Sequence, residues 1–247
     1  MGISTSTSAD AYFAGLLEGD GYIGAARSKV QTTRATVELT LTDKAAIECF
    51  QIYVNTKYAN GKPIKIRYPR PARANHKETF KVGISGKKAE YLIRDLYKYW
   101  FSHRKNQSEK LLAECGLPPV SGNEDNEIFR GLPWLAGLLD AEGCFKQHKT
   151  GKYTYPQIQL EMTCRDIVTF VADWVNREIP PFTGAKKGRP EQIVAVLERK
   201  RQVLNRKNSF CLQINGRRAI YLAALLKPHI RNSDKLDDVH NMLVSLC

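Results

Sequence analysis

Two stretches of this chain occur twice in the same order, and such a duplication limits the folds that the chain can adopt. Residues 79–93, TFKVGISGKKAEYLI, match residues 209–223, SFCLQINGRRAIYLA, at a constant offset of 130. Earlier in each half, YFAGLLEGDGYI (12–23) matches WLAGLLDAEGCF (134–145) at an offset of 122. This pattern indicates two copies of one structural unit in tandem.

The duplication predicts two domains of similar architecture. We expect an N-terminal repeat over residues 1–115 and a C-terminal repeat over 132–247, joined by a linker at 116–131 that contains Pro, Gly and acidic residues. Each repeat is predicted to follow the order α-β-β-α-β-β-α. The fold class expected from this order is α+β, with antiparallel sheets.

The first helix is expected at about residues 10–19. Ser8 or Asp10 is a suitable N-cap, and Gly21 suits the left-handed conformation that often ends a helix.

Alternating apolar and polar residues predict strands with one buried and one open face. In the two clearest strands the apolar positions are Val37, Leu39, Leu41, Ile158, Leu160 and Met162. PIKIRY (63–68) and FKVGI (80–84) predict two more strands. The polar face of such a sheet suits the edges of base pairs in a DNA major groove, and the alternative is an ordinary solvated face.

The charge of the chain points to a polyanionic partner. Lys and Arg outnumber Asp and Glu 38 to 25, which gives a formal net charge of +13. Residues 57–110 hold fifteen basic and four acidic residues, and residues 184–218 hold ten and two. These two basic zones favour nucleic acid or an acidic membrane surface over a merely soluble basic surface.

The cysteines and the hydropathy pattern predict an intracellular protein. No Cys or His spacing suggests a zinc site or a disulfide framework, so we expect buried thiols in a reducing compartment. The six cysteines are Cys49, Cys115, Cys144, Cys164, Cys211 and Cys247. No apolar run approaches the roughly 20 residues that span a bilayer, and no signal-peptide core is present.

The repeated apolar helix ends in an acid followed by glycine. Small residues four apart, Gly15 with Gly19 and Gly137 with Ala141, predict that the two helices pack closely together. Asp20 and Glu142 are then expected side by side at helix C-termini, where the helix dipole disfavours carboxylates. A divalent cation removes this conflict, and the carbonyls of Gly19 and Ala141 can complete a hard oxygen site for Mg²⁺.

The strings FAGLLEGDG and LAGLLDAEG resemble the two signature motifs of monomeric LAGLIDADG homing endonucleases, and the resemblance covers nearly the whole chain. It implies two pseudo-symmetric αββαββα repeats, whose sheets form a DNA-binding saddle with the motif helices packed at the interface. It also implies a monomer that binds double-stranded DNA and no membrane. The expected cofactor is Mg²⁺, with Mn²⁺ or Ca²⁺ as substitutes and Ca²⁺ not supporting cleavage.

The resemblance assigns roles to particular residues. Asp20 and Glu142 match the metal-binding acids, and one phosphodiester on each DNA strand is hydrolysed across a minor groove, leaving 3′ overhangs. Family members carry a polar residue at the end of the second strand, where this chain has Asp43 in one repeat and Cys164 in the other. A basic residue near the start of the last helix corresponds to Lys105 or its neighbour Arg104 in the first repeat. The second repeat offers Arg231 or Lys235.

The open sheet faces and basic zones supply the expected DNA contacts. These residues are Gly24, Ala26, Ser28, Arg34, Thr36, Glu38, Thr40, Lys65, Arg67, Lys81, Lys146, His148, Tyr155, Gln157, Gln159, Glu161, Lys200 and Gln213. Two repeats, each roughly 35 Å across, predict a site of about twenty base pairs, which is non-palindromic because the two sets of residues differ.

Two other functions fit the same resemblance. One is an intron maturase, which binds RNA and assists splicing, and the other is a DNA-binding regulator that does not cut. Retention of both acids favours cleavage, in the service of intron or intein homing. A mitochondrial or chloroplast location is expected if the gene lies in an organellar intron.

Overall fold

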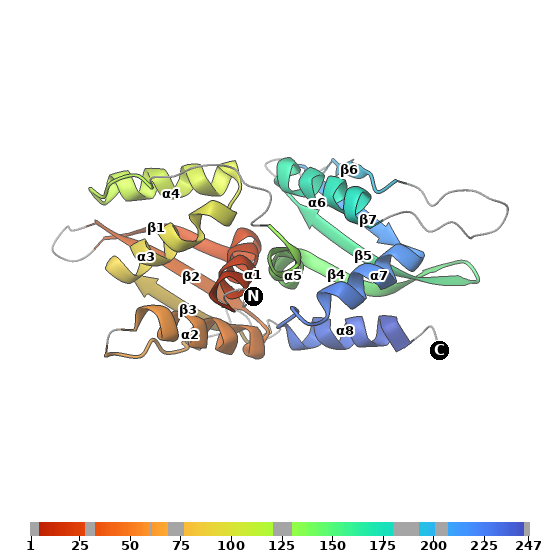
Figure 1. The fold of residues 1–247 in the computed structure, drawn as a ribbon, viewed down its shortest axis with the longest axis horizontal. Coiled ribbons are helices and arrows are strands. Elements are labelled where there is room, and N and C mark those ends of the chain that lie inside the picture. Colours follow the sequence, from red (N-terminus) through yellow and green to blue (C-terminus); the bar gives the residue numbers. More distant parts are fainter. Residues whose placement is uncertain are drawn as a thin grey trace. The chain divides into compact units, whose positions relative to one another are not determined.

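The computed structural model describes residues 5–27, 33–59, 61–68, 77–120, 130–179, 193–200 and 207–244, and it is an α+β fold (Figure 1). The chain forms two compact units. The first consists of Met1–Ala141 with Arg231–Ser233, and the second of Glu142–Ile230 with Asp234–Cys247. The motif helix of the second repeat therefore packs in the first unit. The repeat boundaries at residues 115 and 132 stay a prediction.

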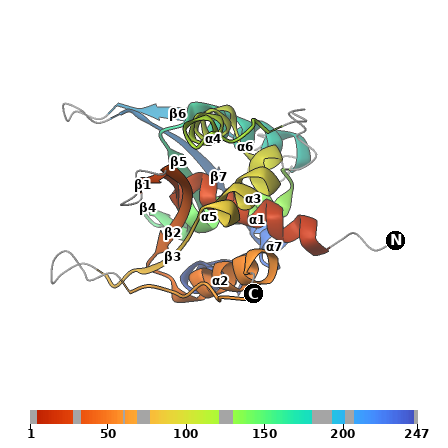
Figure 2. The ribbon, with the colours of Figure 1, turned by 90° about the vertical axis from the view of Figure 1, so that its left-hand side faces the viewer.

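The first unit is built on a three-stranded antiparallel sheet in the order β1-β2-β3. Its elements are α1 (Thr5–Asp20), β1 (Gly21–Arg27), β2 (Thr33–Leu41), α2 (Lys44–Tyr58), β3 (Phe80–Ser85), α3 (Lys87–Leu96), a 3-10 turn (Tyr97–Tyr99), α4 (Ser102–Glu114) and α5 (Leu132–Glu142). Helices α2, α3 and α4 each contact the sheet, and Figure 2 shows them on one side of it.

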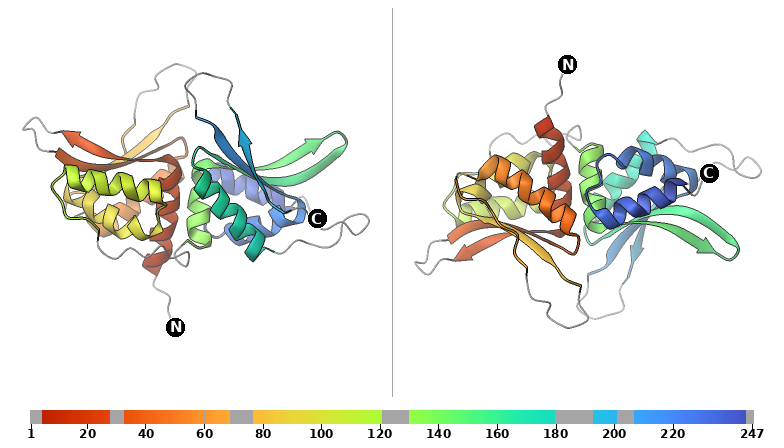
Figure 3. Two further views of the ribbon diagram at one scale, coloured as in Figure 1. Left: turned by 90° about the horizontal axis from the view of Figure 1, so that it is seen from above. Right: turned by 90° about the horizontal axis from the view of Figure 1, so that it is seen from below.

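The second unit is built on a four-stranded antiparallel sheet in the order β4-β5-β7-β6. Its elements are β4 (Gly143–Thr150), β5 (Tyr153–Met162), α6 (Arg165–Glu178), β6 (Val196–Arg199), β7 (Ser209–Asn215), α7 (Gly216–Leu226) and α8 (Ser233–Val244). Helices α6 and α7 contact the sheet, and Figure 3 shows the helices on one of its faces.

The alternation predicted for the central strands is confirmed. Val37 and Leu39 on β2, and Ile158 and Leu160 on β5, are completely buried beneath the helices. Because side chains alternate along a strand, the polar residues between them face away from the helices. Each sheet thus has one apolar core face and one polar face, as the sequence indicates.

The strand predicted at residues 63–68 is wrong. Of that segment only Arg67 bridges to β3, with a pair of backbone hydrogen bonds to Lys81. The backbone of Ile64 is bound instead by the Asn55 side chain of α2, whose amide accepts from Ile64 N at 2.7 Å and donates to Ile64 O at 3.0 Å. Pro63 also lacks the N–H that a ladder requires. Residues 80–84, in contrast, form most of β3 as predicted.

Both predicted ends of the first helix need correction. The helix begins at Thr5, so Ser8 and Asp10 lie inside it and neither is its N-cap. Asp10 is buried and accepts hydrogen bonds from Tyr53 and Lys57 of α2, which explains an acid at this position. Gly21 is the first residue of β1 and does not have a positive φ. A side chain is excluded there because its Cβ would lie 2.4 Å from the carbonyl oxygen of Leu17.

The expectation of buried thiols is wrong for most of the described cysteines. Cys211 is buried, Cys144 is exposed on β4, and Cys49, Cys115 and Cys164 are half-buried. Cys247 lies outside the described residues. In the part of the chain that the structure describes, no helix is long and apolar enough to span a membrane.

Candidate catalytic acids and nucleic-acid interface

Helices α1 and α5 pack backbone against backbone, as the small residues predict. A Cβ atom on Gly15 would lie 2.0 Å from the carbonyl oxygen of Trp134, and one on Gly137 would lie 1.9 Å from that of Tyr12. Both distances are far below van der Waals contact, so neither glycine can be replaced without separating the helices.

Asp20 and Glu142 are the last residues of α1 and α5, and both are exposed. Each is followed by a glycine that begins a strand. Carboxylate oxygens at a helix C-terminus, next to the last carbonyls, form the hard donor set that Mg²⁺ prefers. Within the described residues no three His, Cys, Asp or Glu side chains gather into a metal site. Mg²⁺ usually keeps several water ligands and binds through one or two carboxylates. The meeting of the Asp20 and Glu142 carboxylates stays a prediction.

A second acid in each motif has a role that the sequence did not reveal. Glu18 of α1 is buried and accepts a 3.3 Å hydrogen bond from Phe101 N, at the start of α4. His103 Nε2 lies 3.3 Å from its other oxygen. Burial raises the pKa of Glu18 to about 7, although the Arg104 guanidinium opposes this rise.

Asp140, at the matching position of α5, likewise accepts hydrogen bonds from backbone amides that precede a helix. One of its carboxylate oxygens accepts hydrogen bonds from Arg231 N at 2.7 Å, Asn232 N at 3.1 Å and the Tyr12 hydroxyl at 2.6 Å. Helix α8 begins at Ser233, directly after these amides. An anion at a helix N-terminus is favoured by the free N–H groups and the helix dipole.

The hydrogen bonds that Glu18 and Asp140 accept from backbone amides are related by the offsets of the duplication. Glu18 and Asp140 are 122 residues apart, and their amide donors, Phe101 and Arg231, are 130 apart. These are the offsets of the repeated strings, so the contact in one repeat identifies the equivalent contact in the other.

The basic candidates differ in their surroundings. Arg104 is buried and donates hydrogen bonds to the carbonyls of Leu17 and Glu18, which end α1, so it caps that helix. Lys105 is also buried, with its ammonium 5.4 Å from the centre of the Tyr97 ring. Arg231 is exposed. Lys235 is half-buried on α8, so Arg231 is the one of the four candidates with an exposed side chain that can reach a bound molecule.

Asp43 and Cys164 occupy equivalent positions but differ in bonding. Asp43 is the N-cap of α2, where one oxygen accepts from Ala46 N at 2.7 Å and the other accepts from Ser233. This buried, fully bonded geometry favours a structural role for Asp43 over the expected catalytic one. Cys164 is the N-cap of α6, and its side chain makes no capping hydrogen bond.

The polar face of the first sheet brings together most of the contacts predicted there. Gly24 pairs with Thr36, and Ala26 pairs with Arg34. Thr36 is only 9% exposed and its hydroxyl oxygen is buried, so the prediction that it contacts DNA is corrected. On the same face Glu38, Thr40 and Lys81 lie on adjacent strands, with a 2.6 Å ion pair between Glu38 and Lys81.

Other predicted contacts of the first unit lie apart from this face or outside the description. Lys65 and Arg67 are exposed on the segment that joins α2 to β3, and Ser28 lies outside the described residues. The sequence prediction omitted Tyr22, which is 53% exposed and extends over Gly24, where a Cβ would lie 2.2 Å from its hydroxyl.

The polar face of the second sheet is more extensively hydrogen-bonded. Lys146 donates to Gln159 at 3.0 Å, and the rings of His148 and Tyr155 lie 5.1 Å apart. Gln157 is only 2% exposed and donates to Asn215 at 2.8 Å, so the prediction that it contacts DNA is corrected.

Acidic and basic groups are paired at the β6 edge of this sheet. Glu161 accepts from Ser209 at 2.6 Å and from Arg199 at 2.7 Å. Lys200 is exposed just beyond β6, and Gln213 is half-buried between Gln159 and the β6 edge. The prediction omitted Arg199 and Asn215, which are exposed on this face, although alternation along β6 and β7 would have found them.

Solved structures similar to this chain include LAGLIDADG endonucleases. LAGLIDADG meganuclease I-AabMI bound to uncleaved DNA matches with a TM-score of 0.58 at 14% identity, over 95% of this chain and 89% of that one. Homing endonuclease I-GzeII in complex with its DNA target matches with a TM-score of 0.57 at 11% identity, over 94% and 88%. I-DmoI in complex with DNA and Mn matches at 0.50 and 18% identity, over 90% and 97%.

These likenesses confirm the predicted fold class and the resemblance in fold to LAGLIDADG endonucleases. No protein-family profile and no curated protein matches the sequence.

Proposed function

We propose that this protein is a site-specific, metal-dependent DNA endonuclease. The observation that carries the proposal is the ending of α1 and α5, where Asp20 and Glu142 are exposed immediately before a glycine. The shared fold supports it, because similar structures include LAGLIDADG endonucleases bound to uncleaved and to cleaved DNA.

In this proposal Asp20 and Glu142 each hold a divalent ion through carboxylate oxygens, next to the carbonyls of Gly19 and Ala141. When bound, the ion activates a water molecule and stabilises the charge that develops at the phosphodiester. Mg²⁺ is the proposed ion, with Mn²⁺ as a substitute and Ca²⁺ supporting binding only. Structures of the same fold contain Mn or were obtained with calcium ions.

Hydrogen bonds to the neighbouring acids Glu18 and Asp140 fix the backbone of the segments beside the motif helices. Glu18 and Asp140 hold the segments that lead into α4 and α8, so Arg231 is fixed through its backbone N–H while its side chain stays exposed. Fixing the backbone lowers the entropy cost of placing the guanidinium on a phosphate.

The substrate proposed is double-stranded DNA, read by the polar sheet faces over about twenty base pairs. The site is non-palindromic because the two faces carry different side chains. One phosphodiester is hydrolysed on each strand across the minor groove, leaving 3′ overhangs, and the biological role is intron or intein homing.

Cleavage of a randomised library of long duplexes in Mg²⁺ tests the function. We expect selected sites to be cut by the wild type. Loss of one outer-shell partner of a metal typically costs 10–100-fold, so losing a direct ligand by Asp20→Asn or Glu142→Gln should slow cleavage at least about 100-fold. Asp237→Asn removes an exposed acid of α8 and should leave the rate unchanged.

Two outcomes would replace the proposal. Binding of DNA without cleavage by all four proteins would indicate a regulator. Selective retention of a structured intron RNA would indicate a maturase.

A further inference from the structure

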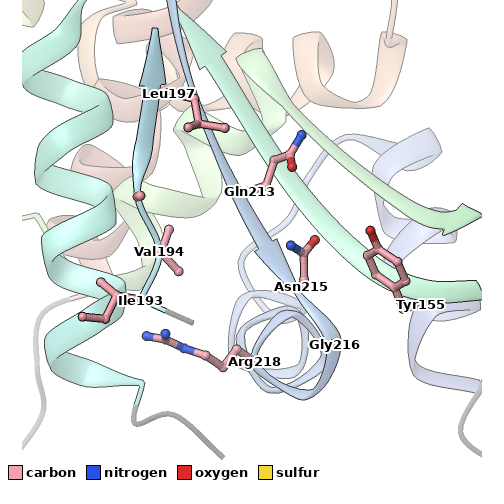
Figure 4. A pocket seen from close by; sticks show the side chains of 9 residues that line it. Tyr155, Ile193, Val194, Leu197, Gln213, Asn215, Gly216 and Arg218 are labelled. Carbon is pink, nitrogen blue, oxygen red and sulfur yellow. The ribbon is translucent and has the colours of Figure 1, made fainter. Parts of the chain in front are cut away.

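A pocket of about 490 Å³ opens on the polar side of the second sheet, at the start of β6 (Figure 4). Gln213 and Asn215 of β7, which line it, alternate with the buried Leu212 and Ile214. The pocket is therefore part of the face that we propose for DNA, and it does not belong to the hydrophobic core.

One side of the pocket is aliphatic although it faces solvent. Ile193 is 77% exposed and Leu197 is 53% exposed, and both line the pocket together with Val194. The backbone of Val194 is fixed by Asn176 of α6, which accepts from its N–H at 3.0 Å and donates to its carbonyl at 2.9 Å. The aliphatic wall is thus preformed, and apolar contact with a ligand would remove it from water.

The opposite side of the pocket carries amide groups. The side-chain oxygen of Asn215 already accepts a hydrogen bond from the Gln157 amide. Gln213 makes no side-chain hydrogen bond with the described part of the chain, so its amide has both a donor and an acceptor to offer. Figure 4 shows the side chains of Gln213 and Leu197 on neighbouring strands above the pocket.

An amide beside an aliphatic group matches one combination of base-pair features. In the major groove, Gln pairs with the N6 and N7 atoms of adenine, and aliphatic side chains contact the C5-methyl group of thymine. Guanine and cytosine offer neither the methyl group nor the same donor and acceptor pair.

We propose that this pocket is a thymine subsite of the DNA interface. Leu197 and Ile193 contact the thymine methyl group, and the Gln213 amide bonds to a neighbouring adenine. The inference rests on the proposed function and adds to it a specificity determinant in the second unit.

Substitution of deoxyuridine for thymine tests the subsite, because it removes the methyl group and keeps the base pairing. The probe is a duplex selected from the randomised library, with each thymine replaced singly, and binding is measured in Ca²⁺. Burial of one methyl group corresponds to about fourfold in affinity, so one position should bind about fourfold more weakly as deoxyuridine. Leu197→Ala should reduce the difference between thymine and deoxyuridine at that position, because only Ile193 then contacts the methyl group.

Matched variants distinguish loss of the thymine contact from a general loss of folding or DNA binding. Ile52→Ala truncates a 64% exposed aliphatic side chain on α2 and should leave the fourfold effect intact. Gln213→Ala should reduce discrimination against G·C at the adjacent base pair. Since Leu197 is exposed, its variant should melt at the wild-type temperature.

The subsite is overturned if DNA binds but no deoxyuridine position is weakened, or if Leu197→Ala keeps the wild-type sensitivity. Failure of every duplex to bind would overturn the proposed function itself, and the two failures are therefore distinguishable.

Discussion

At the scale of single residues, Glu18 is an acid whose burial opposes its ionisation. Its folded pKa of about 7 lies above the ordinary value of 4.5. Between these values the folded protein binds a proton that the unfolded chain has released, so stability falls as pH rises from 4.5 to 7. The ionised carboxylate of Glu18 therefore lowers the free energy of unfolding at neutral pH.

Glu18→Gln should stabilise the protein above pH 7 and have little effect below pH 4.5. Glutamine keeps the oxygen that accepts from Phe101 N, and it removes the ionisation penalty. A pKa difference of this size corresponds to at most about 3 kcal/mol. Urea unfolding over a pH series, with EDTA present, measures the difference.

Glu48→Gln is the control for this prediction, because Glu48 is exposed on α2 and forms an ion pair with Lys44 one turn away. Its effect should be small and nearly independent of pH. A constant advantage of Glu18→Gln at every pH would contradict the proposed pKa.

The roles of single residues were the hardest to predict from the sequence. The motif acids Asp20 and Glu142 could be singled out because their position before glycine conflicts with the helix dipole. The buried acids Glu18 and Asp140 could not, since their partners lie more than 80 residues away in the chain. The family resemblance gave Asp43 a catalytic role, whereas in the structure its carboxylate caps α2 and accepts from Ser233.

At the scale of elements, helices α2 and α6 begin alike but are capped differently. Asp43 and Cys164 both have extended backbone conformations, with φ of −85° and −92°. The Asp43 carboxylate accepts from Ala46 N, whereas the Cys164 side chain makes no capping bond. The equivalent helix of the second unit therefore starts without side-chain capping.

Cys164→Asp should stabilise the second unit by about 1 kcal/mol, because Asp is among the best N-cap residues. Denaturant unfolding should show a higher midpoint with an unchanged slope. Cys164→Ala is the matched control and should give no gain. Equal stability of the Asp and Ala variants would show that the carboxylate does not reach the amides of α6.

Predicting elements succeeded where the pattern was local and failed where a side chain from elsewhere intervened. The alternation of apolar and polar residues predicted β2 and β5 correctly, because every second residue of a strand lies on the buried face. PIKIRY has the same local pattern, but Asn55 binds the backbone of Ile64 and only one bridge forms. Asn176 binds Val194 in the same way in the second unit, just before β6 begins.

At the scale of the whole molecule, the duplication was enough to predict the fold class. Equal order and nearly constant offsets require equivalent elements, and the motif glycines require a close helix pair, which Gly15 and Gly137 form. Sequence matching cannot reveal how contacts divide the chain. Helix α5 packs with the first unit although it belongs to the second repeat.

The excess of positive charge predicts DNA binding that weakens steeply with salt. Each phosphate contact releases counterions, so a protein that neutralises six to ten phosphates loses about 10³ to 10⁵ in affinity between 50 and 200 mM salt. Dissociation constants for a selected duplex, measured in Ca²⁺ over a KCl series, give the slope. Lys65→Ala removes an exposed charge beside the first sheet and should reduce the slope by about 0.9, whereas Lys44→Ala, on the helix-covered side, should not. An affinity that hardly changes with salt would mean that base contacts dominate, and the two basic zones would then need another partner.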